Sequence, residues 1–195
     1  MIDLSGLPLK KADPVLQEFG GILTPPLGGV RQRIDRAGTR WALDCETPQM
    51  EMEPDGREWS ARIVSAKREG ALIAIPQPDL VIGNPGNPAV SVTVQSGRLV
   101  PIAGMAPGYV LRAGQWVSFV RAGQRFADQV RAAVIADANG TAVIPIQYLL
   151  RRSLVAGDVV EVSKPMMEGS IVGDISWPND TTGFTAFAFQ IEEDE

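Results

Sequence analysis

Histidine is absent from the 195 residues of this chain, and cysteine occurs only once, at Cys45. The lack of histidine excludes a Ser/His/Asp triad, a His-activated thiolate and imidazole metal ligands. One cysteine cannot form an internal disulfide bond, and Cys45 shares a strand face with Trp41 and Leu43. We therefore expect a buried, unreactive thiol, no metal, no cofactor, no catalytic residue and a protein that is not an enzyme.

Long apolar runs and clusters of basic residues are also missing. No stretch reaches the ~18 apolar residues of a membrane span, and residues 1–20 lack the pattern of a signal peptide. We expect a soluble protein made in the cytoplasm, without membrane insertion. The 18 Lys and Arg residues are scattered and are outnumbered by 23 Asp and Glu, for a net charge of −5. This balance disfavours nucleic-acid binding.

Acidic residues gather at the end of the sequence, where Glu192, Glu193, Asp194 and Glu195 follow one another. A short run of like charge at a terminus is usually solvated. We therefore predict an exposed acidic end with no specific role.

What the sequence does contain is typical of a folded β protein. Hydrophobic residues make up 45% and charged residues 21%, which is enough apolar material for a core. The 20 glycines and 15 prolines separate short apolar runs, as they do in proteins built from strands and turns. The length fits one large domain or two small ones, since domains commonly have ~100 to 150 residues.

The first part of the chain predicts a strand pair. Residues 20–30 combine glycines with a Pro-Pro pair and indicate an extended loop. Residues 30–35 and 40–46 flank turn-forming residues at 36–39, and the second run alternates between apolar and polar side chains. This pattern predicts a hairpin with a half-buried second strand.

A single convincing helix follows over residues 54–70. Pro54 suits the first turn of a helix, and Gly70 stands where a helix ends. Trp59, Ile63 and Ala66 are spaced to share one face, which predicts a helix packed on a sheet through Trp59.

A domain boundary is expected at residues 84–88, which read Asn-Pro-Gly-Asn-Pro. Short strands follow up to residue 162, with one hairpin joining 115–120 to 125–130 and another formed at Asn139-Gly140. The spacing favours a small barrel or sandwich over residues 86–162. The strands are predicted at 90–94, 98–102, 116–120, 126–135, 142–146 and 159–162.

The last part predicts a loop and then a central strand. Residues 163–183 contain scattered glycines and prolines and are interpreted as loop. Residues 184–191 are apolar on both faces, as in a strand covered on both sides, and we expect this strand to return to the first domain. The predicted domains are therefore 1–85 plus 163–195, with 86–162 inserted between them.

Candidate chemistry is sparse. Asp137, Asn139 and Gly140 loosely match a calcium loop, but the later acidic ligands are missing, so a hairpin turn is favoured. No glycine-rich phosphate loop is present. Several carboxylates could act as a general acid or base, but the spacing of these residues indicates no catalytic pair. They are Asp44, Glu46, Glu51, Glu53, Asp158, Glu161 and Glu168.

Four aromatic residues leave a sugar-binding role open. Trp116 and Trp177, with Tyr109 and Tyr148, could stack on sugars if they were exposed, although such residues more often lie in the core of β proteins. A carbohydrate-binding β module for attachment to a host surface is therefore the alternative function. A hydrolase that uses only carboxylates would need two of them to converge in a cleft.

The order of elements resembles that of the distal tail proteins of long-tailed, siphovirus-type bacteriophages. The short members of this family have an OB-like barrel inserted in the N-terminal fold. The resemblance covers most of the chain. It is carried by Arg40-Trp41-Ala42-Leu43 with Pro48, by Arg57-Glu58-Trp59 through Arg68-Glu69-Gly70, by residues 165–169 and by residues 184–193.

This resemblance implies a mainly β fold with one α-helix. It would consist of a β-sandwich or split-barrel domain like that of tail tubes, with a small OB-like barrel inserted. It also implies a structural protein of the virion tail tip, a hexameric ring that joins the tail tube protein to the tail hub and fibre proteins. DNA would only pass through the lumen, and the barrel would face outward toward other tail proteins or host glycans. Edges of the hairpin at residues 30–46 would pair between subunits.

Five arginines are the candidates for contacts between subunits. They lie in the predicted hairpin and on the predicted helix, and they are Arg31, Arg33, Arg36, Arg62 and Arg68.

Overall fold

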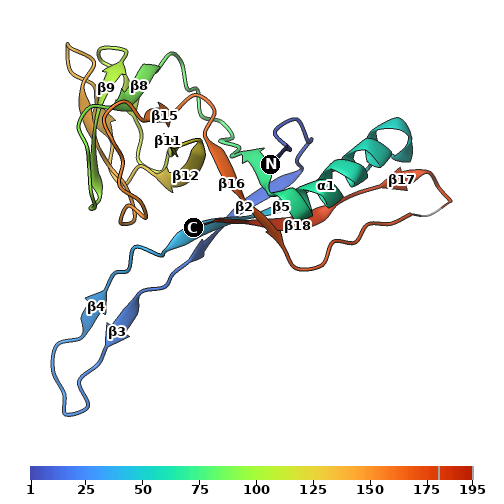
Figure 1. Cartoon of the computed structure of the whole chain (residues 1–195), viewed down its shortest axis with the longest axis horizontal. Helices are drawn as coiled ribbons and strands as arrows, with labels where there is room; N and C mark the ends of the chain where they lie inside the picture. Colours follow the sequence, from blue (N-terminus) through green and yellow to red (C-terminus); the bar gives the residue numbers. More distant parts are fainter. Residues whose placement is uncertain (180, 195) are drawn as a thin grey trace.

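The protein is mainly β, with short strands and a single α-helix in the described part of the chain (Figure 1). The structure, a computed structural model, describes residues 1–179 and 181–194. The predicted fold class is confirmed at this level. Two six-stranded sheets lie side by side, and a two-stranded ribbon projects away from both of them (Figure 1).

Strands from the two ends of the sequence form the first sheet, which we call the body sheet. Its order is β1-β7-β16-β18-β5-β2, with β1 parallel to β7 and every other pair antiparallel. β18 lies between β16 and β5, so the prediction that the last strand is central is confirmed. The bounds are β1 Ile2–Asp3, β7 Ala71–Ala74, β16 Met166–Val172, β18 Ala188–Glu193, β5 Arg40–Glu46 and β2 Lys11–Gln17.

Strands from the middle of the chain form the second sheet, which we call the insert sheet because it lies between β7 and β16 in sequence. Its order is β12-β11-β15-β8-β9-β14, and a separate pair, β10 with β13, lies beside it. The bounds are β8 Gly86–Val90, β9 Leu99–Met105, β10 Val110–Leu111, β11 Trp116–Arg121, β12 Gln124–Gln129, β13 Val134–Ile135, β14 Ala142–Pro145 and β15 Val159–Glu161.

Each sheet has its own apolar cluster. The body cluster includes Leu43, Ile73 and Ile191, and the insert cluster includes Phe119 and Ile144. Trp116 and Ala127 of the insert sheet belong to the body cluster, so the two sheets meet through apolar contacts as well as polar ones.

The helix forms much as its sequence predicts. α1 Arg57–Glu69 follows a π-helical turn, η1 Met52–Gly56, and ends at Gly70, whose N–H donates to the Ala66 carbonyl at 2.9 Å. Ile63 and Ala66 are fully buried and Trp59 is partly buried, and the helix packs against β1 and β16. This arrangement confirms the predicted apolar face and the predicted end of the helix.

The hairpin predicted around residues 36–39 is wrong. β4 Gln32–Ile34 pairs with β3 Gly21–Leu23, and β5 pairs with β2, so the chain reverses at residues 24–31 instead. The two prolines and the glycines that we interpreted as a loop form this reversal, while residues 36–39 only bend the returning strand. The Thr39 hydroxyl accepts a 3.4 Å hydrogen bond from the Phe19 N–H, which holds the outgoing and returning segments of the chain together at the bend.

The hairpin predicted at Asn139-Gly140 is also wrong. Residues 137–141 form a tight turn, in which the Asp137 carboxylate accepts the N–H groups of Asn139 and Thr141 at 2.8 Å each. The strands on either side do not pair with each other, because β13 pairs with β10 and β14 pairs with β9. The Gly140 carbonyl instead accepts from the Met105 N–H at the end of β9, which holds the turn against that strand.

The predicted loop at residues 163–183 contains a strand, β16, and that prediction is wrong for residues 166–172. The break in its apolar pattern is Gly169, which we interpreted as a turn residue. A Cβ at Gly169 would lie 1.9 Å from the Glu192 carbonyl oxygen on β18, so a side chain would overlap the neighbouring backbone. Gly169 is therefore needed for strand packing. Asp180 lies outside the described residues.

A short pair of strands lies next to the body sheet in sequence. β17 Phe184–Thr185 pairs with β6 Met50–Glu51, and the chain bends before β18 begins. The Phe187 N–H at this bend donates to the Thr47 hydroxyl at 2.9 Å. The single strand predicted over 184–191 is therefore two strands.

Gly169→Ala is expected to destabilise the protein by about 3 kcal/mol or more, because the new methyl group meets backbone that cannot move aside. Chemical denaturation of both proteins measures the difference in the free energy of unfolding. Gly38→Ala is the matched control, since a Cβ there meets open space, and its effect should stay within about 0.5 kcal/mol. Equal stability of the two variants would contradict the close approach.

Candidate functional site

The ribbon is the most exposed part of the described chain. We use this name for residues 18–38, which contain β3, β4 and the connection between them (Figure 1). β3 and β4 pair only with each other, so each has a free edge. Gly28 and Gly29 have φ values of 82° and 155°, which a reversal after Pro25 and Pro26 requires.

Apolar side chains lie exposed along the ribbon, and at its base the Arg40 guanidinium lies 5.2 Å from the centre of the Phe19 ring. Leu27 is 98% exposed and Val30 is 85% exposed, both at the tip. Apolar groups gathered on a free strand edge are typical of a surface that pairs with another protein. The other exposed apolar residues of the ribbon are Phe19, Ile22, Leu23 and Ile34.

The five arginines predicted for subunit contacts fall into two groups. Arg31, Arg33 and Arg36 lie on the ribbon and are exposed, whereas Arg62 and Arg68 lie on α1. The structure does not bring the two groups together on one element. The ribbon arginines accompany the exposed apolar side chains, and the helix arginines do not.

Two of these arginines have partners within the chain. The Arg33 guanidinium forms ion pairs with Glu18 and Asp35. The Arg62 guanidinium donates to the Asp3 carbonyl and lies 4.4 Å from the centre of the Trp59 ring. Arg62 therefore fastens the helix to the N-terminal segment, a structural role within the subunit.

A buried carboxylate joins the two sheets, and it belongs to the acidic end that we predicted to be solvated. Glu193 is 1% exposed, so the prediction is wrong for this residue. Its oxygens accept from the Trp41 N–H at 2.9 Å and the Ala127 N–H at 2.7 Å, and they pair with the Arg151 guanidinium at 2.8 Å. Asp194 accepts from the Ser170 hydroxyl, and Glu195 lies outside the described residues.

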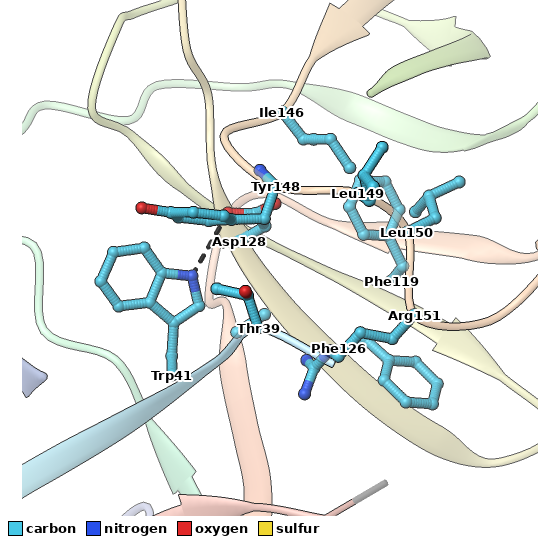
Figure 2. A pocket seen from close by; sticks show the side chains of 11 residues that line it. Thr39, Trp41, Phe119, Phe126, Asp128, Ile146, Tyr148, Leu149, Leu150 and Arg151 are labelled. Carbon is cyan, nitrogen blue, oxygen red and sulfur yellow. Dashed lines mark hydrogen bonds between the residues drawn. The ribbon is translucent and has the colours of Figure 1, made fainter. Parts of the chain in front are cut away.

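A second carboxylate at this junction belongs to the insert sheet and accepts a hydrogen bond from the body sheet. Asp128 of β12 accepts a 3.2 Å hydrogen bond from the Trp41 indole N–H of the body sheet, as Figure 2 shows. It also accepts from the N–H groups of Gln129 and Tyr148. Burial raises the pKa of Asp128 to about 6, against the opposing effect of these hydrogen bonds. Burial likewise raises the pKa of Glu193.

The space at this junction is too small for a substrate. The cavity beside Trp41, Asp128 and Tyr148 has a volume of about 20 Å³ and is lined mostly by packed side chains (Figure 2). This volume is close to that needed for one water molecule. The Arg151 guanidinium lies 5.3 Å from the centre of the Phe126 ring and fills one side of it. The junction therefore has the character of a structural joint.

The aromatic residues considered for sugar binding are packed. Trp116 is 5% exposed and meets the Trp41 ring edge-on at 4.8 Å between ring centres. Tyr148 lies 5.9 Å from Trp41 in the same manner, and Tyr109 packs on the insert cluster. Trp177 is half-buried against Phe187. Trp116 is buried, and the other three are half-buried against neighbouring apolar side chains, which disfavours stacking on a sugar.

Most of the candidate carboxylates form ion pairs with arginine side chains. Glu161 and Glu168 both contact the Arg125 guanidinium, at 3.1 and 3.9 Å. Only Glu161 of the two lines the groove beside Arg125, so they do not converge on an open cleft. Burial raises the pKa of the Cys45 thiol to about 12, which fits the unreactive thiol that we predicted. The described residues include no group of three or more acidic or Cys side chains that could hold a metal ion.

The comparisons with known proteins assign no family. No protein-family model matches this chain, and no curated protein matches its sequence. In the described part of the chain, no helix is both long and apolar enough to cross a membrane.

Sequence reasoning missed the junction, although a signal for Glu193 was present. Phe187, Phe189 and Ile191 alternate along the last strand, and Glu193 continues the same period of two onto the buried face. Asp128 and Arg151 gave no comparable signal, because their burial depends on how the two sheets meet.

Asp128→Asn is expected to remove part of the pH dependence of stability. Because the folded-state pKa of Asp128 is raised, folding favours the protonated form, and the wild type loses stability as pH rises from about 4 to 7. The loss from this group is about 2–3 kcal/mol. The amide stays neutral and keeps an oxygen for the Trp41 indole N–H. Denaturation at several pH values should show that the free energy of unfolding of the variant increases relative to that of the wild type as pH rises. Parallel curves of unfolding free energy against pH would contradict the raised pKa of Asp128.

Glu193→Ala is expected to cost about 3 kcal/mol or more, because it leaves the buried Arg151 charge and two backbone N–H groups without acceptors. Glu192→Ala is the matched control on the same strand, where the side chain is only half-buried. Its cost should stay below about 1 kcal/mol. The account of the junction fails if the two variants lose the same free energy of unfolding.

Proposed function

We propose that this chain is a structural protein of the tail tip of a long-tailed bacteriophage. In this proposal it forms a hexameric ring that joins the tail tube to the tail hub and fibres, and DNA passes through the central channel. The observation that carries the proposal is the exposed apolar ribbon, whose free strand edges and apolar side chains are available to another subunit. The mainly β architecture and the order of elements along the chain support it further.

The ribbon supports assembly for an energetic reason. Its apolar side chains lie in water in the single subunit, and burial stabilises by about 25 cal/mol per Å² of apolar surface. A ribbon that reaches from one subunit to a different surface of the next makes a head-to-tail contact. Such contacts close into rings when the rotation between subunits allows it.

Charge supports a second copy as the neighbour. Three arginines, one glutamate and one aspartate give the ribbon a net charge of +1, whereas the rest of the chain carries −6. A weakly basic ribbon is therefore attracted to the acidic surface of an identical subunit. An acidic ring also suits a channel through which DNA slides without binding.

In this proposal the two parts of the chain have different tasks. Residues 1–85 plus 163–195, which hold the body sheet and the ribbon, form the ring. Residues 86–162, which hold the insert sheet, are a small OB-like barrel that faces outward toward other tail proteins. The packed state of the aromatic side chains disfavours a sugar-binding module as the main function.

Light scattering at increasing concentration, with negative-stain imaging of the same sample, tests the ring. We expect the mass to rise from the 20.9 kDa monomer to six times that value, with six-fold particles around a central hole. A monomer at all concentrations contradicts the proposal.

The double variant Leu27→Glu/Val30→Glu is expected to stay monomeric, because two charges at the ribbon tip cannot be buried without partners. Its stability should match the wild type, since neither side chain packs in the subunit. Val81→Glu is the control, because Val81 is 83% exposed but lies outside the ribbon, and it should assemble normally. Assembly of the double variant would show that another surface makes the contact.

A further inference from the structure

Three arginines from separate parts of the chain converge on a polar cleft where the ribbon meets the insert sheet. The cleft has a volume of about 310 Å³. Arg33 comes from β4, Arg98 directly precedes β9, and Arg131 follows β12. The remaining lining residues are Asp35, Gln147 and Tyr148.

Two of the arginines are held in place by carboxylates. Asp35 accepts from the Arg33 Nε at 3.3 Å and also from the Arg98 guanidinium, which links the ribbon to the insert sheet. Glu18 pairs with Arg33 from the other side. A guanidinium has five N–H donors, so these contacts leave most donors of Arg33 and Arg98 available. The carboxylates therefore position the two arginines and leave N–H donors of both free to bind a ligand.

Arg131 has no such partner. Its guanidinium forms no ion pair with any described residue, while its backbone N–H is fixed to the Pro145 carbonyl at 2.7 Å. The cleft residues carry three positive charges and one negative charge, and Glu18, which pairs with Arg33, adds a second negative charge, for a local net charge of +1. An arginine that is anchored at its backbone and unpaired at its tip leaves room for an anion.

Neutral donors complete the cleft. Gln147 supplies an amide and Tyr148 a hydroxyl, and the Tyr148 ring is kept in position by its edge-on contact with Trp41. Burial raises the pKa of Tyr148, and the carboxylates of Glu18 and Asp128 act in the same direction. Arg33 and Arg98 act in the opposite direction, so the hydroxyl lies within the electrostatic reach of both arginines.

We propose that this cleft binds a phosphate group, either as inorganic phosphate or as a phosphate monoester. Several guanidinium groups that line one cleft match an anion with several acceptor oxygens. A single carboxylate offers two acceptor oxygens, fewer than the N–H donors that the three guanidinium groups leave available. The cleft wall is mostly polar, so the part that is recognised is the phosphate itself. This inference does not depend on the ring.

Isothermal titration calorimetry at low ionic strength tests the site with the full chain. Inorganic phosphate and glycerol phosphate are the two ligands, and sodium acetate at matched ionic strength is the control. We expect one saturable site per chain for phosphate and at least tenfold weaker binding of acetate. Tighter binding of glycerol phosphate would identify a monoester as the natural form, and tighter binding of inorganic phosphate would identify the free ion. Absence of saturable binding for both phosphates overturns the proposal.

Arg131→Gln locates the site. It removes the unpaired charge and breaks no ion pair of the subunit, so phosphate binding should weaken at least tenfold while the denaturation curve is unchanged. Arg112→Gln is the matched control, since Arg112 is an exposed arginine near the insert sheet that does not line the cleft. Binding that weakens equally in both variants would show attraction by overall charge only, and would overturn the cleft as the site.

Discussion

The buried Glu193 carboxylate is the interaction on which the arrangement of the molecule depends. It lies at the end of β18, the strand between β16 and β5, and accepts N–H groups from both sheets. While the sheets are docked, a buried charge without these partners would be strongly unfavourable, so the docked arrangement must keep all of them in place. Asp128 adds the reverse contact from the insert sheet to Trp41. The insert is therefore docked on the body by hydrogen bonds to two buried carboxyl groups as well as by apolar packing.

The same junction sets where the ribbon leaves the body. Trp41, which donates to both carboxylates, lies three residues after the end of the ribbon, and buried Thr39 between them binds back to Phe19. The ribbon thus begins at a fixed point while its tip is free. Asp35 and Arg98 tie its base to the insert sheet. A projecting element with a rigid base loses little conformational entropy when it binds, which favours its use in assembly.

Sequence signals predicted the elements whose structure depends on residues that are near one another in the chain. Gly70 and the spacing of Ile63 and Ala66 were sufficient for the helix and its end, whereas Pro54, predicted in its first turn, lies in the preceding η1 turn. Alternation located β5, and turn residues between short apolar runs located β9, β11, β14 and β15. Strand pairing was not predictable in the same way. Pro14 obscured β2, which tolerates a proline because it is an edge strand, and without β2 the strand at 40–46 lacked its true neighbour.

The candidate sites were less predictable than the fold. The junction needs Asp128 and Arg151 beside Glu193, and the cleft needs Arg98 and Arg131 beside Arg33, and these residues are far apart in sequence. Only the docking of the two sheets brings them together. The ribbon tip is the exception, because its prolines and glycines were visible as a feature, although their role as a strand reversal was not.

Amide hydrogen exchange below and above the concentration of assembly tests the central claim, that the ribbon makes the subunit contact. The account predicts fast exchange across residues 18–38 in the monomer and strong protection of the same amides in the assembly. Amides of β11 and β15 should be protected equally in both. Ribbon amides that exchange equally fast in both states, with new protection elsewhere on the chain, would contradict it.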